Sequence, residues 1–294
     1  MIVFLSILYM VTLVKSYSYI FNPLLKFGEA SKLRKHLREE MCSSYKYLTY
    51  PIAKKILHDH VNMIDIYGDN IEDKNVEHIF PQFSFNHHEN KCMMRSDLHN
   101  LYLCNSKINS YRQNFKYVDS SGSNGYDNIK ILDLKGNVVS NNAEIFKQIG
   151  YLMISNKKNR IFVPTPYSRG KIARSLSYFA IKYDYISELK KIIDIETLLE
   201  WNIKDPVDND EYLKNIIIYK YQKNVNPFVL DPDLMLYCFA DMATIDNELL
   251  KKKRYSNIDP LYTIEYLLNN INELENLKSF NDKIMLNLFK KYNV

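Results

Sequence analysis

Residues 75–82 read Asn75-Val76-Glu77-His78-Ile79-Phe80-Pro81-Gln82, which places a carboxylate directly beside an imidazole. If residues 76–80 are extended, Glu77 and His78 point to opposite sides of the backbone. A carboxylate oxygen suits Mg²⁺, and an imidazole with a pKa of about 6.5 accepts a proton from water near neutrality. One side chain can then hold a metal ion while the other faces a separate water molecule. By spacing alone, a surface pair without chemistry is the simpler interpretation.

A side-chain amide follows about 35 residues after His78, in the run Asn109-Ser110-Tyr111-Arg112-Gln113-Asn114-Phe115. Apolar residues recur here at helical spacing, which predicts a helix with Asn114 beside its apolar stripe. From there the Asn114 amide could point back at the extended stretch and supply a second hard oxygen. Arg112 lies about 200° round the helix from Asn114 and shares a face with Asn109 instead. We therefore do not expect Arg112 and Asn114 to face one phosphate unless the helix ends or distorts there.

Between these runs lies Arg95-Ser96-Asp97-Leu98-His99-Asn100-Leu101. Asp97 and His99 alternate along a segment that we expect to be extended, so both side chains should face one side. The favoured interpretation is a buried, hydrogen-bonded pair beside the site. The alternative is a pair of phosphate or metal neighbours.

The rest of the pattern is mostly helical, with some strand. A hairpin is predicted over 129–139, with its turn near Lys135-Gly136-Asn137. Apolar periodicity predicts helices over 27–65, 144–155, 171–183, 186–200, 211–222 and most of the last fifty residues. The expected class is α+β, helix-rich with a small mixed sheet. No linker divides 27–240 into two domains.

Taken in order, these motifs resemble the bacterial endonuclease I family, whose members are secreted or periplasmic nucleases. The resemblance covers roughly residues 65–235 and implies a ββα-metal (His-Me finger) core. Beyond the three runs above, it is carried by Arg169-Gly170-Lys171-Ile172-Ala173-Arg174, Leu198-Leu199-Glu200-Trp201, Asp205-Pro206-Val207 and Gln222-x-Asn224-x-Asn226-Pro227-Phe228.

The resemblance also implies site roles. Glu77 and Asn114 match the family's metal ligands for one Mg²⁺, with Mn²⁺ or Ca²⁺ as alternatives, and His78 matches its general base. It implies phosphodiester hydrolysis in DNA, and in RNA as well, with little sequence preference and with 5′-phosphate products. We expect a backbone carbonyl to orient His78 through its other ring nitrogen.

Other positions are expected to contact nucleic acid or to support the site. The family's phosphate-contacting arginine has no secure match, and Arg95 and Lys91 are the candidates. The chain also departs from the family at Lys171, where Asp is usual, and at Val225, where Arg is usual. The expected nucleic-acid contacts are Arg95, Arg112, Lys171 and Arg174, and the expected supporting residues are Asp97, His99 and Asn109. An inactive or retargeted nucleic-acid-binding protein on the same scaffold is the alternative, and a structure-specific nuclease is a weaker one.

The first residues have the pattern of an export signal. Residues 2–14 are almost wholly apolar, and Ser16-Tyr17-Ser18 resembles a cleavage site, although no basic residue comes first. We expect a signal peptide over 1–18, a nuclease domain over 19–240, a helical extension over 241–294 and a secreted protein. A buried first helix is the alternative to the signal peptide.

Composition sets the remaining limits. The chain has 294 residues, of which 46% are hydrophobic and 25% charged, so wholesale disorder is excluded. The net charge of +5 does not repel an acidic partner, and no apolar run is long enough to span a membrane. In an exported chain the four cysteines could form disulfides, with Cys92–Cys104 as the first pair. The alternative is a cytosolic protein with four free, buried thiols, at Cys42, Cys92, Cys104 and Cys238.

Overall fold

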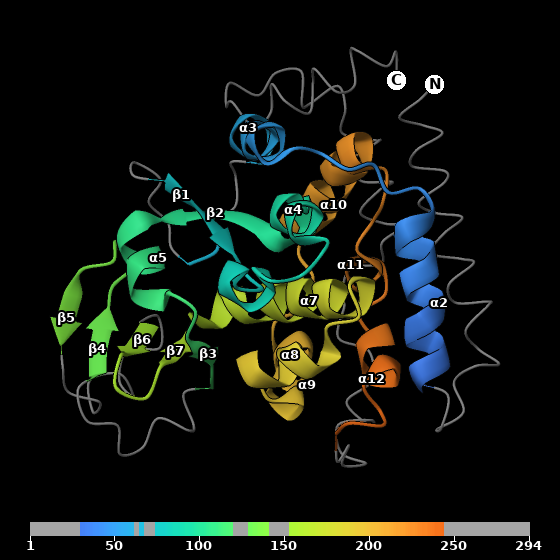
Figure 1. Cartoon of the computed structure of the whole chain (residues 1–294). Coiled ribbons are helices and arrows are strands. Elements are labelled where there is room, and N and C mark those ends of the chain that lie inside the picture. Colours follow the sequence, from blue (N-terminus) through green and yellow to red (C-terminus); the bar gives the residue numbers. More distant parts are fainter. Residues whose placement is uncertain (1–29, 62–64, 68–73, 120–128, 141–152, 244–294) are drawn as a thin grey trace.

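The computed structural model describes residues 30–61, 65–67, 74–119, 129–140 and 153–243, and structural statements refer to these residues. A β-β-α unit forms one part of the molecule (Figure 1). In this unit Glu77 lies opposite Tyr102 in an antiparallel pair of strands. The Asn105 side chain starts the helix by accepting hydrogen bonds from the backbone N–H groups of Lys107 and Ile108. The three elements are β1 (Lys74–His78), β2 (Leu101–Asn105) and α5 (Ser106–Arg112).

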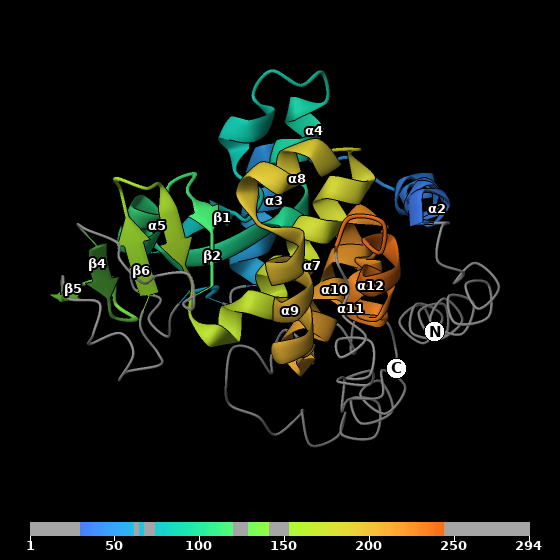
Figure 2. The ribbon, with the colours of Figure 1, turned by 90° about the horizontal axis from the view of Figure 1, so that it is seen from below.

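A mixed five-stranded sheet lies beside this unit (Figure 2). Its order is β3-β7-β6-β4-β5; β3 and β7 are parallel, and the other pairs are antiparallel. The predicted hairpin is β4–β5, and Gly136 in its turn has a φ of +74°, which favours glycine. The strands are β3 (Lys116–Tyr117), β4 (Ile129–Leu132), β5 (Val138–Ser140), β6 (Met153–Asn156) and β7 (Ile161–Val163).

Helix α7 is the centre of the helical part. One of its ends meets the five-stranded sheet and the other meets α2 (Figure 1). Most of its residues are buried, so it is a core helix rather than a surface helix. The helices are α2 (Ala30–Ser43), α3 (Tyr50–His60), α4 (Lys91–Ser96), α7 (Pro166–Lys182), α8 (Ile186–Ile192), α9 (Ile195–Lys204), α10 (Asn209–Gln222), α11 (Pro227–Leu230) and α12 (Leu234–Cys238), with 3₁₀ turns η1 (Gln82–Phe85) and η2 (Leu98–Asn100). Within the described ranges, no helix combines the length and the apolar character needed to cross a membrane.

The described helices and strands confirm the α+β class, but several sequence predictions were wrong in detail. Residues 153–155 form part of β6 rather than a helix, because they pair with β4 and β7. The predicted helix over 27–65 is two helices, α2 and α3. The Cys92–Cys104 disulfide is also wrong: all four cysteines are free, with Cys104 buried in β2 and Cys92 exposed on α4. The predicted helical extension over 241–294 lies almost wholly outside the described residues, as do the predicted signal peptide and residues 144–152.

Helix α7 lies unusually close to the end of α9. A Cβ atom on Gly170 would lie 1.9 Å from the Asp205 carbonyl oxygen, so only glycine fits. The Gly170 N–H donates to the Asp205 carboxylate at 2.8 Å. One turn later, Arg174 is fully buried, where its guanidinium donates to Glu211, to Asn202 and to the Asp205 carbonyl oxygen. The motifs over 169–174 and 205–207 therefore form one packing unit.

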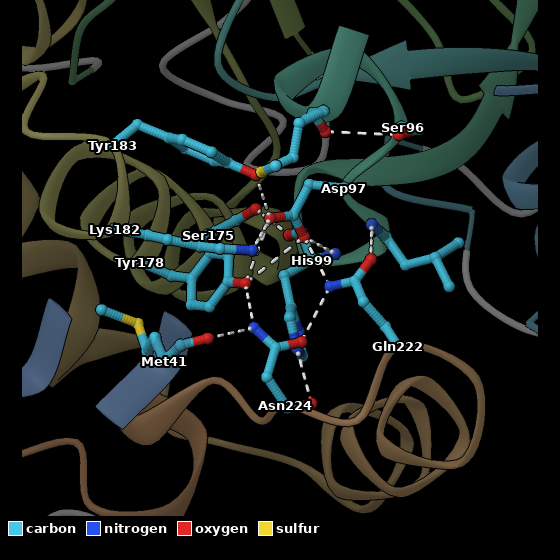
Figure 3. A network of polar contacts seen from close by, with 12 residues as sticks. Met41, Ser96, Asp97, His99, Ser175, Tyr178, Lys182, Tyr183, Gln222 and Asn224 are labelled. Atoms are coloured by element: carbon cyan, nitrogen blue, oxygen red, sulfur yellow. Dashed lines mark hydrogen bonds and ion pairs between the residues drawn. The ribbon is translucent and has the colours of Figure 1, made fainter. Parts of the chain in front are cut away.

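A second polar network surrounds Asp97 (Figure 3). This buried carboxylate accepts hydrogen bonds from the side chains of Lys182, Tyr178, Tyr183 and Gln222 and from a backbone N–H. These donors come from α7, from the residue after α7 and from the end of α10, so the network ties distant segments to η2. The donors to the charged carboxylate and the neighbouring ammonium group hold the pKa of Asp97 below its ordinary value, although burial opposes them.

His99 lies in the same network and makes stability depend on pH. Its ring Nε2 donates to the Asn224 carbonyl oxygen at 3.3 Å, and burial lowers the pKa of His99 to about 3. Because an unfolded histidine takes up a proton below about pH 6.5 and the folded one does not, stability is lost as the pH falls from that value toward 3. We expect His99 alone to contribute about 1.4 kcal/mol per pH unit between pH 6 and 4.

The measurement is the free energy of unfolding in urea at pH 6, 5 and 4, for the unmodified chain and for His99→Gln. Glutamine does not titrate, so the free energy of unfolding of the variant should change less steeply with pH. The difference in slope should be about 1.4 kcal/mol per pH unit, whatever the stability of the variant at pH 7. Equal slopes in the two proteins would show that His99 does not titrate on unfolding.

Candidate active site

His78 is oriented by a backbone carbonyl. Its ring Nε2 lies 2.9 Å from the carbonyl oxygen of Arg95. Because a carbonyl oxygen can only accept, Nε2 must carry the hydrogen, and the neutral ring then has its lone pair on Nδ1. No hydrogen bond from the described residues reaches Nδ1. His78 therefore offers an acceptor nitrogen held in a fixed direction.

Aromatic rings surround His78. The Tyr50 ring stacks on it with centroids 5.8 Å apart, and the Phe85 ring lies at 6.4 Å. Burial lowers the pKa of His78 to about 4, and Arg95 and Arg112 lower it further against the effect of the hydrogen bond. The imidazole is consequently neutral at pH 7, which is the state that accepts a proton.

Glu77 points to the other side of β1, as the sequence predicted, and is buried in a closed polar ring. Its Oε1 accepts from the Tyr67 hydroxyl at 2.9 Å and lies 3.0 Å from Arg112 Nε. Because Tyr67 gives its only hydrogen to Glu77, Tyr117 must donate to Tyr67 across their 2.7 Å contact. Tyr117 accepts in turn from Arg112 Nε at 3.1 Å.

The ring pairs the Glu77 carboxylate with the Arg112 guanidinium. Burial raises the pKa of Glu77 above its ordinary value, although the adjacent Arg112 guanidinium and the Tyr67 hydroxyl oppose the rise. Burial disfavours the charge of Arg112, but the neighbouring Glu77 carboxylate outweighs this effect and raises the pKa of Arg112. The guanidinium therefore stays protonated. Arg112 also donates to the Ile79 carbonyl oxygen at 2.7 Å, which ties the end of α5 to the residue after β1.

Asn114 lies beyond the helix on which it was expected. Helix α5 ends at Arg112 because Gln113 has a φ of +53° and turns the chain toward β3. The exposed Oδ1 of Asn114 accepts from Arg160 Nη2 at 2.7 Å. The turn removes the separation of about 200° between Arg112 and Asn114 that a continuous helix would impose.

Comparison with known proteins identifies the family of this chain. The family model described as Endonuclease I matches residues 62–233, more than half of the chain. The chain belongs to the endonuclease I family. It is 28% identical over 183 residues to "Extracellular ribonuclease" of Bacillus subtilis, covering 56% of this chain and 54% of that protein. It is 25% identical over 171 residues to "Extracellular deoxyribonuclease" of Aeromonas hydrophila, covering 52% of this chain and 63% of that protein. The chain thus spans between half and two thirds of the length of these curated relatives.

The residues that would hold a metal in this endonuclease I family member fit in chemical type. Glu77 and Asn114 supply carboxylate and amide oxygens, the donors that Mg²⁺ takes, and Mg²⁺ keeps several waters. Both oxygens contact arginine side chains, Arg112 at Glu77 and Arg160 at Asn114. No group of three or more His, Cys, Asp or Glu residues suited to a metal occurs in the described segments. The fit therefore depends on these two residues together with water and phosphate oxygens.

The four cationic residues that the sequence assigned to nucleic acid divide into two groups. Arg95 is exposed at the end of α4, and Lys171 on α7 forms an ion pair with Asp208. Arg112 and Arg174 are buried and paired with Glu77 and Glu211. The assignment of Arg112 and Arg174 to nucleic-acid contacts is therefore wrong, because neither guanidinium reaches the surface.

The three expected supporting residues lie in different places. Asn109 donates from its side chain to the Val76 carbonyl oxygen at 3.3 Å, which joins α5 to β1 next to Glu77. Asp97 and His99 are buried in the network of Figure 3, as the favoured interpretation stated. They are not on an extended segment, however, since Asp97 caps the 3₁₀ turn that contains His99.

Sequence reasoning missed four residues of the site: Tyr50, Tyr67, Tyr117 and Arg160. The tyrosines carried no signal because the chain has 24 of them. Arg160 lies 46 residues after Asn114 along the chain, and nothing in its neighbours in the sequence indicates Asn114 as its partner.

Proposed function

We propose that this chain is a divalent-metal-dependent endonuclease that hydrolyses phosphodiester bonds of DNA and RNA with little sequence preference. The observation that carries the proposal is the fixed tautomer of His78, with its free Nδ1, on the strand that also carries Glu77. A neutral, oriented imidazole is what a general base for water requires. Membership of the endonuclease I family supplies the substrate class.

In the proposed reaction, His78 Nδ1 takes a proton from a water molecule as its oxygen attacks phosphorus. The bond from phosphorus to the 3′ oxygen breaks, and the leaving oxygen takes a proton from solvent water, which leaves a 5′-phosphate and a 3′-hydroxyl group. When bound by Glu77 and Asn114, Mg²⁺ would offset the charge that develops on the phosphate and the leaving oxygen. Arg95, exposed beside His78, contacts a phosphate. Contacts to phosphates rather than to base edges carry no sequence information, which accounts for the tolerance.

The experiment is incubation of supercoiled plasmid with the purified chain and Mg²⁺, with EDTA as the control and with Mn²⁺ and Ca²⁺ as alternatives. Nicking that EDTA abolishes, with labelled 5′-phosphate ends, is expected. The same assay on single-stranded DNA, branched DNA and RNA tests the breadth of substrates. Binding of plasmid without any cleavage under all these conditions would favour an inactive nucleic-acid-binding protein instead.

We further propose export, on two grounds: the apolar stretch over 2–14 and the relatives named extracellular. The proposed domain organisation keeps a nuclease domain over 19–240, a span that includes the matched residues 62–233. It also keeps a signal peptide over 1–18 and a C-terminal extension over 241–294.

Arg160 should raise the Mg²⁺ concentration that cleavage requires, because its guanidinium donates a hydrogen bond to the Asn114 oxygen that would bind the metal. We expect Arg160→Ala to lower the Mg²⁺ concentration for half-maximal cleavage by about threefold to tenfold, since an exposed charge-assisted hydrogen bond is worth about 1 kcal/mol. The measurement is initial rate against Mg²⁺ concentration at saturating DNA. Lys157→Ala, an exposed cation close by in the sequence, is the control and should leave the curve unchanged. An unchanged or higher Mg²⁺ requirement in Arg160→Ala would show that Asn114 is not the ligand that Arg160 restrains.

A further inference from the structure

Tyr50 connects the exposed Arg95 side chain with the partly buried His78 ring. The Arg95 guanidinium lies over the Tyr50 ring, 4.2 Å from its centroid. The same ring stacks on His78, and the Arg95 carbonyl fixes the His78 tautomer. Three residues from three elements, α3, α4 and β1, therefore form one contact unit.

The contact with the Tyr50 ring leaves the Arg95 guanidinium able to bind an anion such as a phosphate. Among the described residues, Arg95 forms no ion pair, so the ring face is its main restraint. A carboxylate partner would neutralise the guanidinium and take up its N–H donors. A ring face restrains the cation through the quadrupole of the ring and leaves the N–H groups at its edge available.

Tyr50 comes from outside the part of the chain that the family model matches. It is the first residue of α3, and Pro51 next to it favours helix initiation there. The matched residues begin at position 62, so α3 is a feature of this chain that lies beyond the match.

We propose that Tyr50 is a positioning residue that holds the Arg95 guanidinium ready for a substrate phosphate and packs the His78 ring beside it. The inference rests on the proposed function, because it assigns the phosphate contact to Arg95. It deepens that function by naming the residue that sets the direction of the contact.

The test is a double-mutant cycle between Tyr50→Leu and Arg95→Ala, measured in two ways. The first is KM and kcat for plasmid cleavage with Mg²⁺. The second is the affinity for a fluorescent single-stranded oligonucleotide in EDTA, where no cleavage occurs. In the chain that keeps Arg95, Tyr50→Leu should raise KM and weaken oligonucleotide binding by about fivefold to tenfold. In the Arg95→Ala background the same change should alter the affinity less than about twofold, because the partner is gone.

Matched variants separate positioning from folding. Tyr50→Phe and Tyr50→Trp keep a ring face and should restore the affinity of the unmodified chain. Tyr47→Leu changes an exposed tyrosine three residues earlier, 46% accessible, and should have no effect. Thermal unfolding of each variant shows whether it is folded.

The outcomes distinguish the two proposals. If the chain cleaves DNA but Tyr50→Leu acts equally with and without Arg95, the positioning role is overturned and the nuclease function stands. If no variant cleaves DNA, the nuclease function fails, and the oligonucleotide cycle in EDTA still decides the coupling of Tyr50 to Arg95. Additive effects in that cycle overturn the inference.

Discussion

Replacing His78 with alanine is expected to lower the rate of plasmid cleavage by about 10²–10⁴-fold, the usual contribution of a general base. The physical reason is that Nε2–H donates its hydrogen bond to the Arg95 carbonyl oxygen. Nδ1 is then the ring nitrogen with a free lone pair, and it can accept a proton from water. DNA affinity should change little, because the imidazole acts on water rather than on the bound phosphate. The measurement is kcat and KM with Mg²⁺, with thermal unfolding to verify that the variant folds.

His87→Ala is the matched control for this experiment. His87 is an exposed histidine in the turn after η1, nine residues from His78, and its loss should leave cleavage unchanged. Cleavage by His78→Ala at the full rate would remove the proposed base. An equal loss in both variants would indicate a general effect of removing imidazoles near the surface.

Replacing Arg174 with methionine is expected to destabilise the protein by about 3–5 kcal/mol, because Glu211 would remain buried without its charged partner. The pair has side chains that are 0% and 2% accessible, so water cannot replace the lost contacts. The free energy of unfolding in urea is the measurement. Arg174→Met combined with Glu211→Leu should recover much of the loss, since no unpaired charge stays in the core.

An exposed ion pair on the neighbouring helix is the control for Arg174. Lys204, whose side chain is 60% accessible, forms an ion pair with Glu200. Lys204→Met removes this pair and should change the free energy of unfolding by less than about 0.5 kcal/mol. If Arg174→Met were as stable as the original chain but bound DNA more weakly, Arg174 would be a surface contact after all, and its structural assignment would fall.

The sequence was most informative where local chemistry controls the geometry. Alternation along an extended stretch placed Glu77 and His78 on opposite faces, and the hairpin over 129–139 followed from its turn residues. Helix α7 followed from its periodicity. These features depend on neighbouring residues, so a single sequence contains them.

The sequence was least informative where partners come from distant segments. Arg112 and Arg174 look like surface cations in the sequence, yet each meets a buried glutamate 35 or 37 residues away along the chain. Asn114 lies outside the helix predicted for it because Gln113 has a positive φ. No strong local sequence pattern predicts this conformation of Gln113. The pairing of Tyr50 with Arg95 depends on how α3 packs against α4, which the sequence pattern does not specify.

The central claim is that His78 presents Nδ1 as the proton acceptor because its Nε2 is held by a backbone carbonyl. The most direct test is the nitrogen NMR spectrum of the His78 imidazole at pH 7 in the intact chain. We predict a neutral ring with the proton on Nε2 and the lone pair on Nδ1. A ring protonated on Nδ1 alone would place the lone pair toward the Arg95 carbonyl and would contradict the claim.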